Sequence, residues 1–212
     1  MSDRSDNVWN AHQGIAQGLN KKGVFGAADS HYDNADSTGY LGGKSKYKSE
    51  VDLTIENAGF AARAVNDAGD VVGWYIDSNT GYQHGFLVVN GEARQINHPG
   101  VTSTAAEGIN DKGIVTGQWT SSEGVVSGFY YAIKSGTYTD LYIPGSESGT
   151  DVFGVNDNDV IMAYEPVPYG GGSGGESYVY CIHSKGCPTG AKYHQPRQPH
   201  GPARLEHRAP MP

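Results

Sequence analysis

Short runs of alternating apolar and polar residues, separated by turn-forming residues, fill the middle of this sequence. Between residues 62 and 100 there are four such runs, at 62–65, 70–77, 82–89 and 92–98. They are rich in Val, Ile, Tyr, Phe and Trp, which favour a pleated, half-buried strand. The segments between them, NDAG, SNTG and NG, each end in the glycine that tight hairpins need for a positive φ. The pattern predicts a four-stranded antiparallel meander.

The same unit recurs along the chain. Aligned on the Asn of the first turn, the sequence falls into four copies, at about 14–59, 60–104, 105–149 and 150–186. The aligned residues are Asn20, Asn66, Asn110 and Asn156. Their turns read NKKG, NDAG, NDKG and NDND, so Asp159 stands where the other copies have Gly, a tolerable but poorer left-handed residue. A period of about 40–50 residues with four strands per unit is typical of a propeller blade.

We therefore expect an all-β fold, a small β-propeller of four four-stranded antiparallel blades within residues 1–187, with five blades as the alternative. The fourth copy has no good fourth strand. Residues 7–12 could fill that position from the N-terminal side and remove an exposed sheet edge. Residues 188–212 are rich in Pro and His without apolar periodicity, which predicts a disordered tail.

Composition narrows the classes of partner and the location. The net charge of −8 argues against nucleic-acid binding, which needs a basic face. There is no apolar run long enough to span a membrane, and no signal peptide, so a cytoplasmic location stays open. Cys181 and Cys187 could form a disulfide if the protein is exported, or be thiols otherwise. The oligomeric state is not indicated.

Three motifs resemble the HAF-type repeat of bacterial extracellular proteins. They are AVNDAGDVVGWY, QHGFLVV and INHPG in the second copy, and GINDKGIVTGQW, SGFYYA and YIPG in the third. The resemblance extends over roughly residues 14–186 and is weaker in the two outer copies. It implies a propeller and a secreted or cell-surface origin, and it implies no specific chemistry.

The four aligned asparagines should gather at one end of the propeller axis. One interpretation is turn chemistry, in which each Asn bonds to a backbone N–H of its own turn. The other is a ring of oxygen ligands for Ca²⁺, which takes six to eight oxygens. In architecture and ligand type, this second arrangement is similar to the calcium-dependent propeller lactonases, such as paraoxonase and the gluconolactonase group.

A second group of candidates lies three residues before each Asn, on the inner strands. It consists of Gln17, Arg63, Glu107 and Phe153. Glu107 could act as a metal ligand or general base, and Arg63 could bind a carboxylate or a developing oxyanion. Alternatively, these two residues form an ion pair between adjacent blades. His98, beside Pro99 in a blade connection, is a further candidate base.

Two functional hypotheses follow. In the first, the protein is a calcium-assisted hydrolase of a small lactone or ester, with catalytic residues Glu107, His98 and Arg63 and metal ligands Asn20, Asn66, Asn110, Asn156 and Glu107. In the second, it is a non-catalytic extracellular propeller that recognises a glycan or a protein through its loop face. No sequence motif supports a Ser or Cys nucleophile.

Overall fold

The structure, a computed structural model, describes residues 14–29, 39–43, 46–51, 57–143, 149–165, 176–183 and 187–188. All regular elements in these residues are β-strands, as the alternating pattern predicts. No helix in the described part of the chain has the length and apolar character that crossing a membrane requires. The predicted closing strand at 7–12 and the tail beyond residue 188 lie outside the described residues.

The strands form antiparallel sheets in which neighbours along the chain are neighbours in space, one sheet for each predicted copy. The first sheet contains β1 (Gly14–Leu19), β2 (Phe25–Asp29), β3 (Gly39–Gly43) and β4 (Lys46–Val51). The second contains β5 (Asn57–Val65), β6 (Val71–Asp77), β7 (Gln83–Val89) and β8 (Glu92–Gln95). The third contains β9 (Ser103–Ile109), β10 (Ile114–Thr120), β11 (Val126–Ala132) and β12 (Thr137–Leu141). The fourth contains β13 (Asp151–Val155), β14 (Val160–Glu165) and β15 (Glu176–Cys181).

The turns have the backbone conformations that their residues predict. Asn90 and Gly91, between β7 and β8, have φ values of 53° and 83°, as a two-residue hairpin turn requires. Asp159 adopts φ 60° at the position that glycine occupies in the other copies. Two strand boundaries of the second copy differ from the prediction by more than one residue. β5 begins at Asn57 rather than at residue 62, because its first residues pair with the end of β6, and β8 ends at Gln95 rather than at residue 98.

Apolar side chains join the sheets face to face. Val71, Tyr75 and Phe86 of the second sheet form one fully buried cluster, against which Val24 from the first copy packs. A second cluster joins Val72 and Leu87 of the second sheet to residues of the third, and a third cluster joins the third sheet to the fourth. Each inner strand, β5, β9 or β13, therefore packs on the sheet before it.

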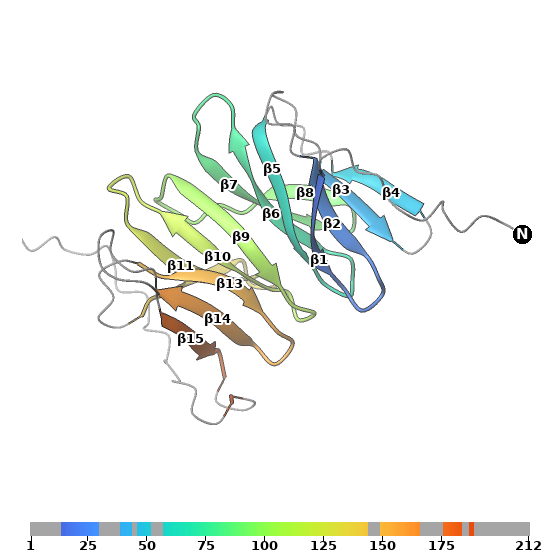
Figure 1. Ribbon diagram of the computed structural model, residues 1–212. Coiled ribbons are helices and arrows are strands. Elements are labelled where there is room, and N and C mark those ends of the chain that lie inside the picture. Colours follow the sequence, from blue (N-terminus) through green and yellow to red (C-terminus); the bar gives the residue numbers. More distant parts are fainter. Residues whose placement is uncertain are drawn as a thin grey trace, which may run out of the picture.

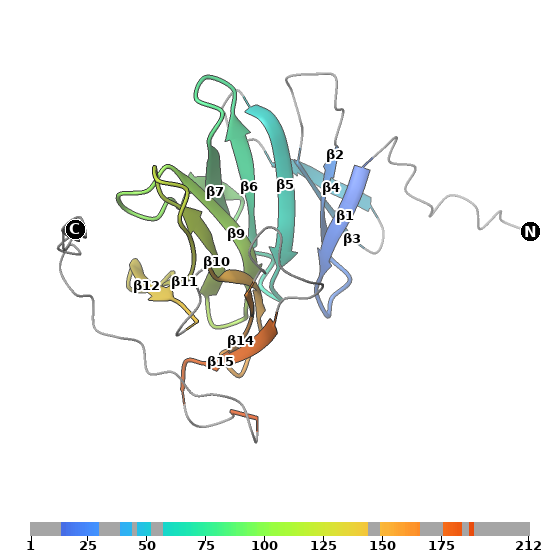
Figure 2. The same cartoon turned by 60° about the vertical axis from the view of Figure 1, so that its left-hand side comes forward.

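Figure 1 shows the sheets following one another in sequence order around an arc, and Figure 2 shows the same succession from a second direction. The all-β architecture of repeated antiparallel sheets is therefore as predicted. The described strands do not close the arc into a complete propeller, and the fourth sheet has three strands among the described residues, one fewer than the others.

Candidate functional site

The four aligned asparagines cap their own turns. The Oδ1 atom of Asn110 accepts hydrogen bonds from the backbone N–H groups of Lys112 at 3.1 Å and Ile114 at 2.9 Å. Asn20 and Asn156 each make the same two bonds, and Asn66 accepts from the N–H of Asp70 at 2.9 Å. These hydrogen bonds agree with the first interpretation of the asparagines, in which each side chain stabilises its own turn by accepting from backbone N–H groups.

The same side chains also link one copy to the next. The Nδ2 atom of Asn20 donates to the backbone oxygen of Asn66 at 2.8 Å. Asn66 donates to the oxygen of Asn110 at 3.3 Å, and Asn110 donates to that of Asn156 at 3.0 Å. We call this series the asparagine ladder. It fixes the separation and order of the four turns, because Asn20, Asn66 and Asn110 each accept through the amide oxygen within their own copy and donate through the amide nitrogen to the next one.

The residue after each Asn builds a second series of contacts. The backbone N–H of Lys21 donates to Asp67, that of Asp67 to Asp111, and that of Asp111 to Asp157, at 3.0, 2.7 and 3.0 Å. The Nζ atom of Lys21 lies 3.4, 3.6 and 3.0 Å from the Oδ2 atoms of these three aspartates. The hydrogen bond that Lys21 donates to Asp157 is the largest cause that raises the pKa of Lys21 well above its usual value. One ammonium group thus bridges the first turn to the other three.

This arrangement does not favour a calcium ion at the turns. The amide oxygens are acceptors for turn N–H groups, and the three aspartates surround an ammonium group already present in the chain. Among the described residues, no group of three or more His, Cys, Asp or Glu side chains is placed to hold a metal ion. Calcium binding stays a prediction, and the donor set that the sequence suggested does not fit it.

Arg63 and Glu107 form the ion pair that the sequence offered as their alternative role. Arg63 Nε lies 2.5 Å from Glu107 Oε2, between the inner strands β5 and β9. The Glu107 side chain is only 8% exposed. Burial raises the pKa of this carboxyl, outweighing the opposing charge and hydrogen bond of Arg63, and the nearby charge of Asp151 raises it further. Burial also raises the pKa of Asp151 itself.

His98 is held in place through both ring nitrogens. Its Nε2 atom lies 3.0 Å from Asp140 Oδ1, and its Nδ1 atom lies 3.2 Å from the backbone oxygen of Pro99. The ring stacks on Trp119 at a centroid distance of 5.3 Å, and the indole Nε1 donates to the same Asp140 oxygen at 2.9 Å. Burial alone would raise the pKa of Asp140, but the hydrogen bonds from His98 and Trp119 lower it. His98 therefore fastens the connection after β8 to the third sheet.

The structure separates the candidates rather than assembling them. The asparagines lie at the turn end of the inner strands, Arg63 and Glu107 lie within those strands, and His98 lies in a connection between sheets. Sequence analysis missed the lysine–aspartate contacts, although the aligned position after each Asn, which reads Lys, Asp, Asp, Asp, carried the signal. It also missed Asp140, whose role depends on the pairing of β11 with β12.

Comparison with known proteins adds no assignment to this geometry. No protein-family model matches the chain, and no curated protein matches it either.

Proposed function

We propose that the chain is a propeller-type binding module of the HAF-repeat kind, which recognises a protein or glycan through its loop end and carries out no reaction. The fourth sheet has three strands among the described residues, and the closing strand at 7–12 stays a prediction.

The observation that carries the binding proposal is a pair of exposed apolar side chains at equivalent positions. Tyr82 is 47% exposed and Val125 is 54% exposed. Each follows the glycine of the turn between the second and third strands of its sheet, and each turn closes with matching backbone bonds, Asp77 to Tyr82 and Ser121 to Val125. Neighbouring sheets thus present apolar groups at the same end, which suits a partner surface.

Two further observations agree with this proposal. Glu107 and His98, the candidate catalytic residues, pair with Arg63 and Asp140 respectively, and both pairs join neighbouring sheets. Cys181 and Cys187 are joined by a disulfide, and such bonds persist in oxidising compartments. An extracellular location is therefore part of the proposal.

Replacing Tyr82 with alanine should weaken binding to the partner on the order of tenfold or more, because an exposed aromatic anchor typically contributes over 1 kcal/mol to an interface. Glycan and peptide arrays would first identify a ligand, and titration calorimetry would then compare the variant with the parent. Lys134→Ala, in an exposed turn between β11 and β12, is the matched surface control. If Tyr82→Ala and the parent bind with equal affinity, the ligand does not bind at the loop end that carries Tyr82.

The second candidate is the hydrolase of a small lactone or ester. It is favoured by the raised pKa values of two carboxyls, Glu107 and Asp151, on neighbouring inner strands, because a raised pKa brings a carboxylate closer to the range of a general base. In this candidate Glu107 accepts the proton of a water molecule that attacks the carbonyl carbon, and Arg63 stabilises the oxyanion.

Glu107→Gln should abolish hydrolysis across a lactone and ester panel, whereas His84→Ala should leave it unchanged. His84 bonds to Asn97 and lies in β7, away from the inner strands. Assays with added calcium and with EDTA, together with the melting temperature, test the metal. If no substrate is turned over under either condition, the hydrolase candidate fails while the binding module is unaffected.

A further inference from the structure

The outward face of the fourth sheet exposes apolar side chains that have buried counterparts in the sheets before it. Met162 is 54% exposed and pairs across the strands with Val179, which is 37% exposed. In the second sheet the same register positions hold Val72 and Leu87, which are fully buried under the third sheet. Phe153, on the same face, is 45% exposed.

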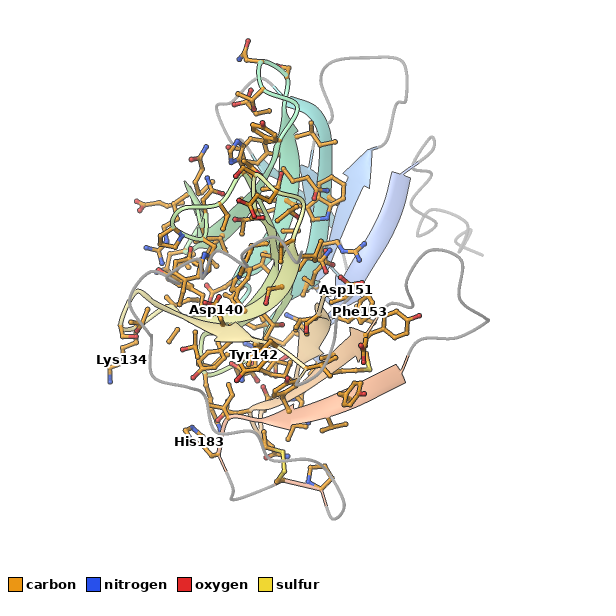
Figure 3. The ribbon with its side chains drawn as sticks, turned by 90° about the vertical axis from the view of Figure 1, so that its left-hand side faces the viewer. Lys134, Asp140, Tyr142, Asp151, Phe153 and His183 are labelled. Carbon is orange, nitrogen blue, oxygen red and sulfur yellow. A yellow bond between two sulfur atoms is a disulfide. The ribbon has the colours of Figure 1, made fainter. Side chains whose placement is uncertain are left out.

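The alternation of burial along β14 shows which face this is. Ile161 and Ala163 are fully buried in the cluster shared with the third sheet, so Met162 between them points to the opposite side. Figure 3 places Asp151 and Phe153 on the side of β13 away from Asp140 and Lys134 of the third copy. The exposed residues therefore lie where a following inner strand would pack.

The backbone of β13 carries a second sign of a missing neighbour. A Cβ atom added to Gly18 would lie 2.8 Å from the Cα of Ala64, and one added to Gly108 would lie 2.8 Å from the Cα of Gly154. A Cβ added to the equivalent Gly154 meets nothing within 4 Å. Inner strands thus touch at this position between the first and second copies and between the third and fourth, and the contact is open after the fourth.

The asparagine ladder ends at the same place. Asn20, Asn66 and Asn110 each donate an Nδ2 hydrogen bond to the next turn. The Nδ2 atom of Asn156 has no hydrogen-bond partner among the described residues, and its side chain is exposed. A turn of the same kind would supply the missing carbonyl.

We propose that this face binds the first sheet, β1 to β4, of a second molecule of this chain, in a head-to-tail contact. The required occupant is an inner strand with a small residue two positions before a turn Asn. β1 fits, with Gly18 and Asn20, and it is the inner strand that follows no other sheet in the described part of the chain. The preceding faces of the other inner strands are already covered by their own neighbours.

Charge at the turns favours the same occupant. The four turns carry four aspartates, Asp67, Asp111, Asp157 and Asp159, against three lysines, Lys21, Lys22 and Lys112, which leaves an excess of one negative charge. A first turn from a second molecule would bring a second Lys21 to these carboxylates. A heterologous contact of this kind repeats from molecule to molecule, so association should increase with concentration.

Sedimentation velocity and light scattering over a wide concentration range test the proposal. The parent chain should self-associate, and Met162→Lys should raise the dissociation constant on the order of tenfold or more, because a charge would be buried without a partner. Tyr142→Lys, changing a side chain of 42% exposure at the end of β12, is the matched control and should associate like the parent. Circular dichroism confirms that both variants are folded.

Three outcomes would overturn the proposal. Association that persists unchanged in Met162→Lys would place the contact elsewhere. A parent chain that stays monomeric and whose Met162 resists oxidation by peroxide would show that the chain covers this face itself. A monomer whose Met162 is readily oxidised would show that the face stays open. None of these results bears on ligand recognition by Tyr82.

Discussion

Asn110→Asp is expected to lower the free energy of unfolding by about 3 kcal/mol, because it places a carboxylate where a buried amide donates two hydrogen bonds. Asn110 is 2% exposed, and its Nδ2 atom donates to the backbone oxygen of Asn156 at 3.0 Å and to Asp159 Oδ1 at 2.8 Å. Aspartate keeps the oxygen that caps the turn but presents a second oxygen to these two acceptors. Urea denaturation at neutral pH measures the loss.

Asn156→Asp is the matched control. Asn156 caps its turn with the same two N–H bonds, and its Nδ2 atom has no partner among the described residues. We expect this substitution to change the unfolding free energy by less than about 1 kcal/mol, since an exposed Asn and Asp cap a turn similarly. Equal losses in the two variants would mean that the asparagine ladder contributes nothing beyond the local turn.

The pH dependence separates the ladder from a general effect of charge. The new carboxyl at position 110 would be buried beside Asp159, so its folded-state pKa should be raised above the unfolded value. A raised carboxyl pKa destabilises the folded state at neutral pH. The deficit should shrink as the pH falls through the raised pKa and the protonated group regains a donor.

The periodic features of this fold could be predicted from sequence, and the contacts between copies could not. Alternating apolar residues and turn glycines gave the strands and hairpins, because these depend on neighbours within a few residues. The direction of each Asn amide, however, depends on the position of the next copy, which no local pattern specifies.

The candidate chemistry shows the same division. From the sequence, Arg63 and Glu107 could be either catalytic residues or an ion pair. The ion pair became evident only from the distance between Arg63 Nε and Glu107 Oε2. The sequence indicated His98 as a candidate base because it lies in a connection between copies. Its partners Asp140 and Trp119 come from two strands of the next sheet, so they could not be identified from the local sequence. Asp159 was expected to be a tolerable but poorer choice than glycine at its turn. Its strained φ is offset by bonds from Asn110 and Lys112 that become visible only in the fold.

Gly108→Ala is expected to destabilise the protein by about 2 kcal/mol, because the added methyl group has no room between two inner strands. Its Cβ would lie 2.7 Å from Thr116 Oγ1 and 2.8 Å from the Cα of Gly154, and the second of these is a backbone atom that cannot rotate away.

Gly154→Ala tests the same position one copy later, where nothing lies within 4 Å, so its unfolding free energy should change by less than about 1 kcal/mol. Thermal and urea denaturation in dilute solution, where the monomer is the species that unfolds, compare the two. Similar losses would show that a further strand already lies against Gly154 in the monomer, whereas a loss in Gly108→Ala alone would establish that the succession of packed inner strands ends at β13.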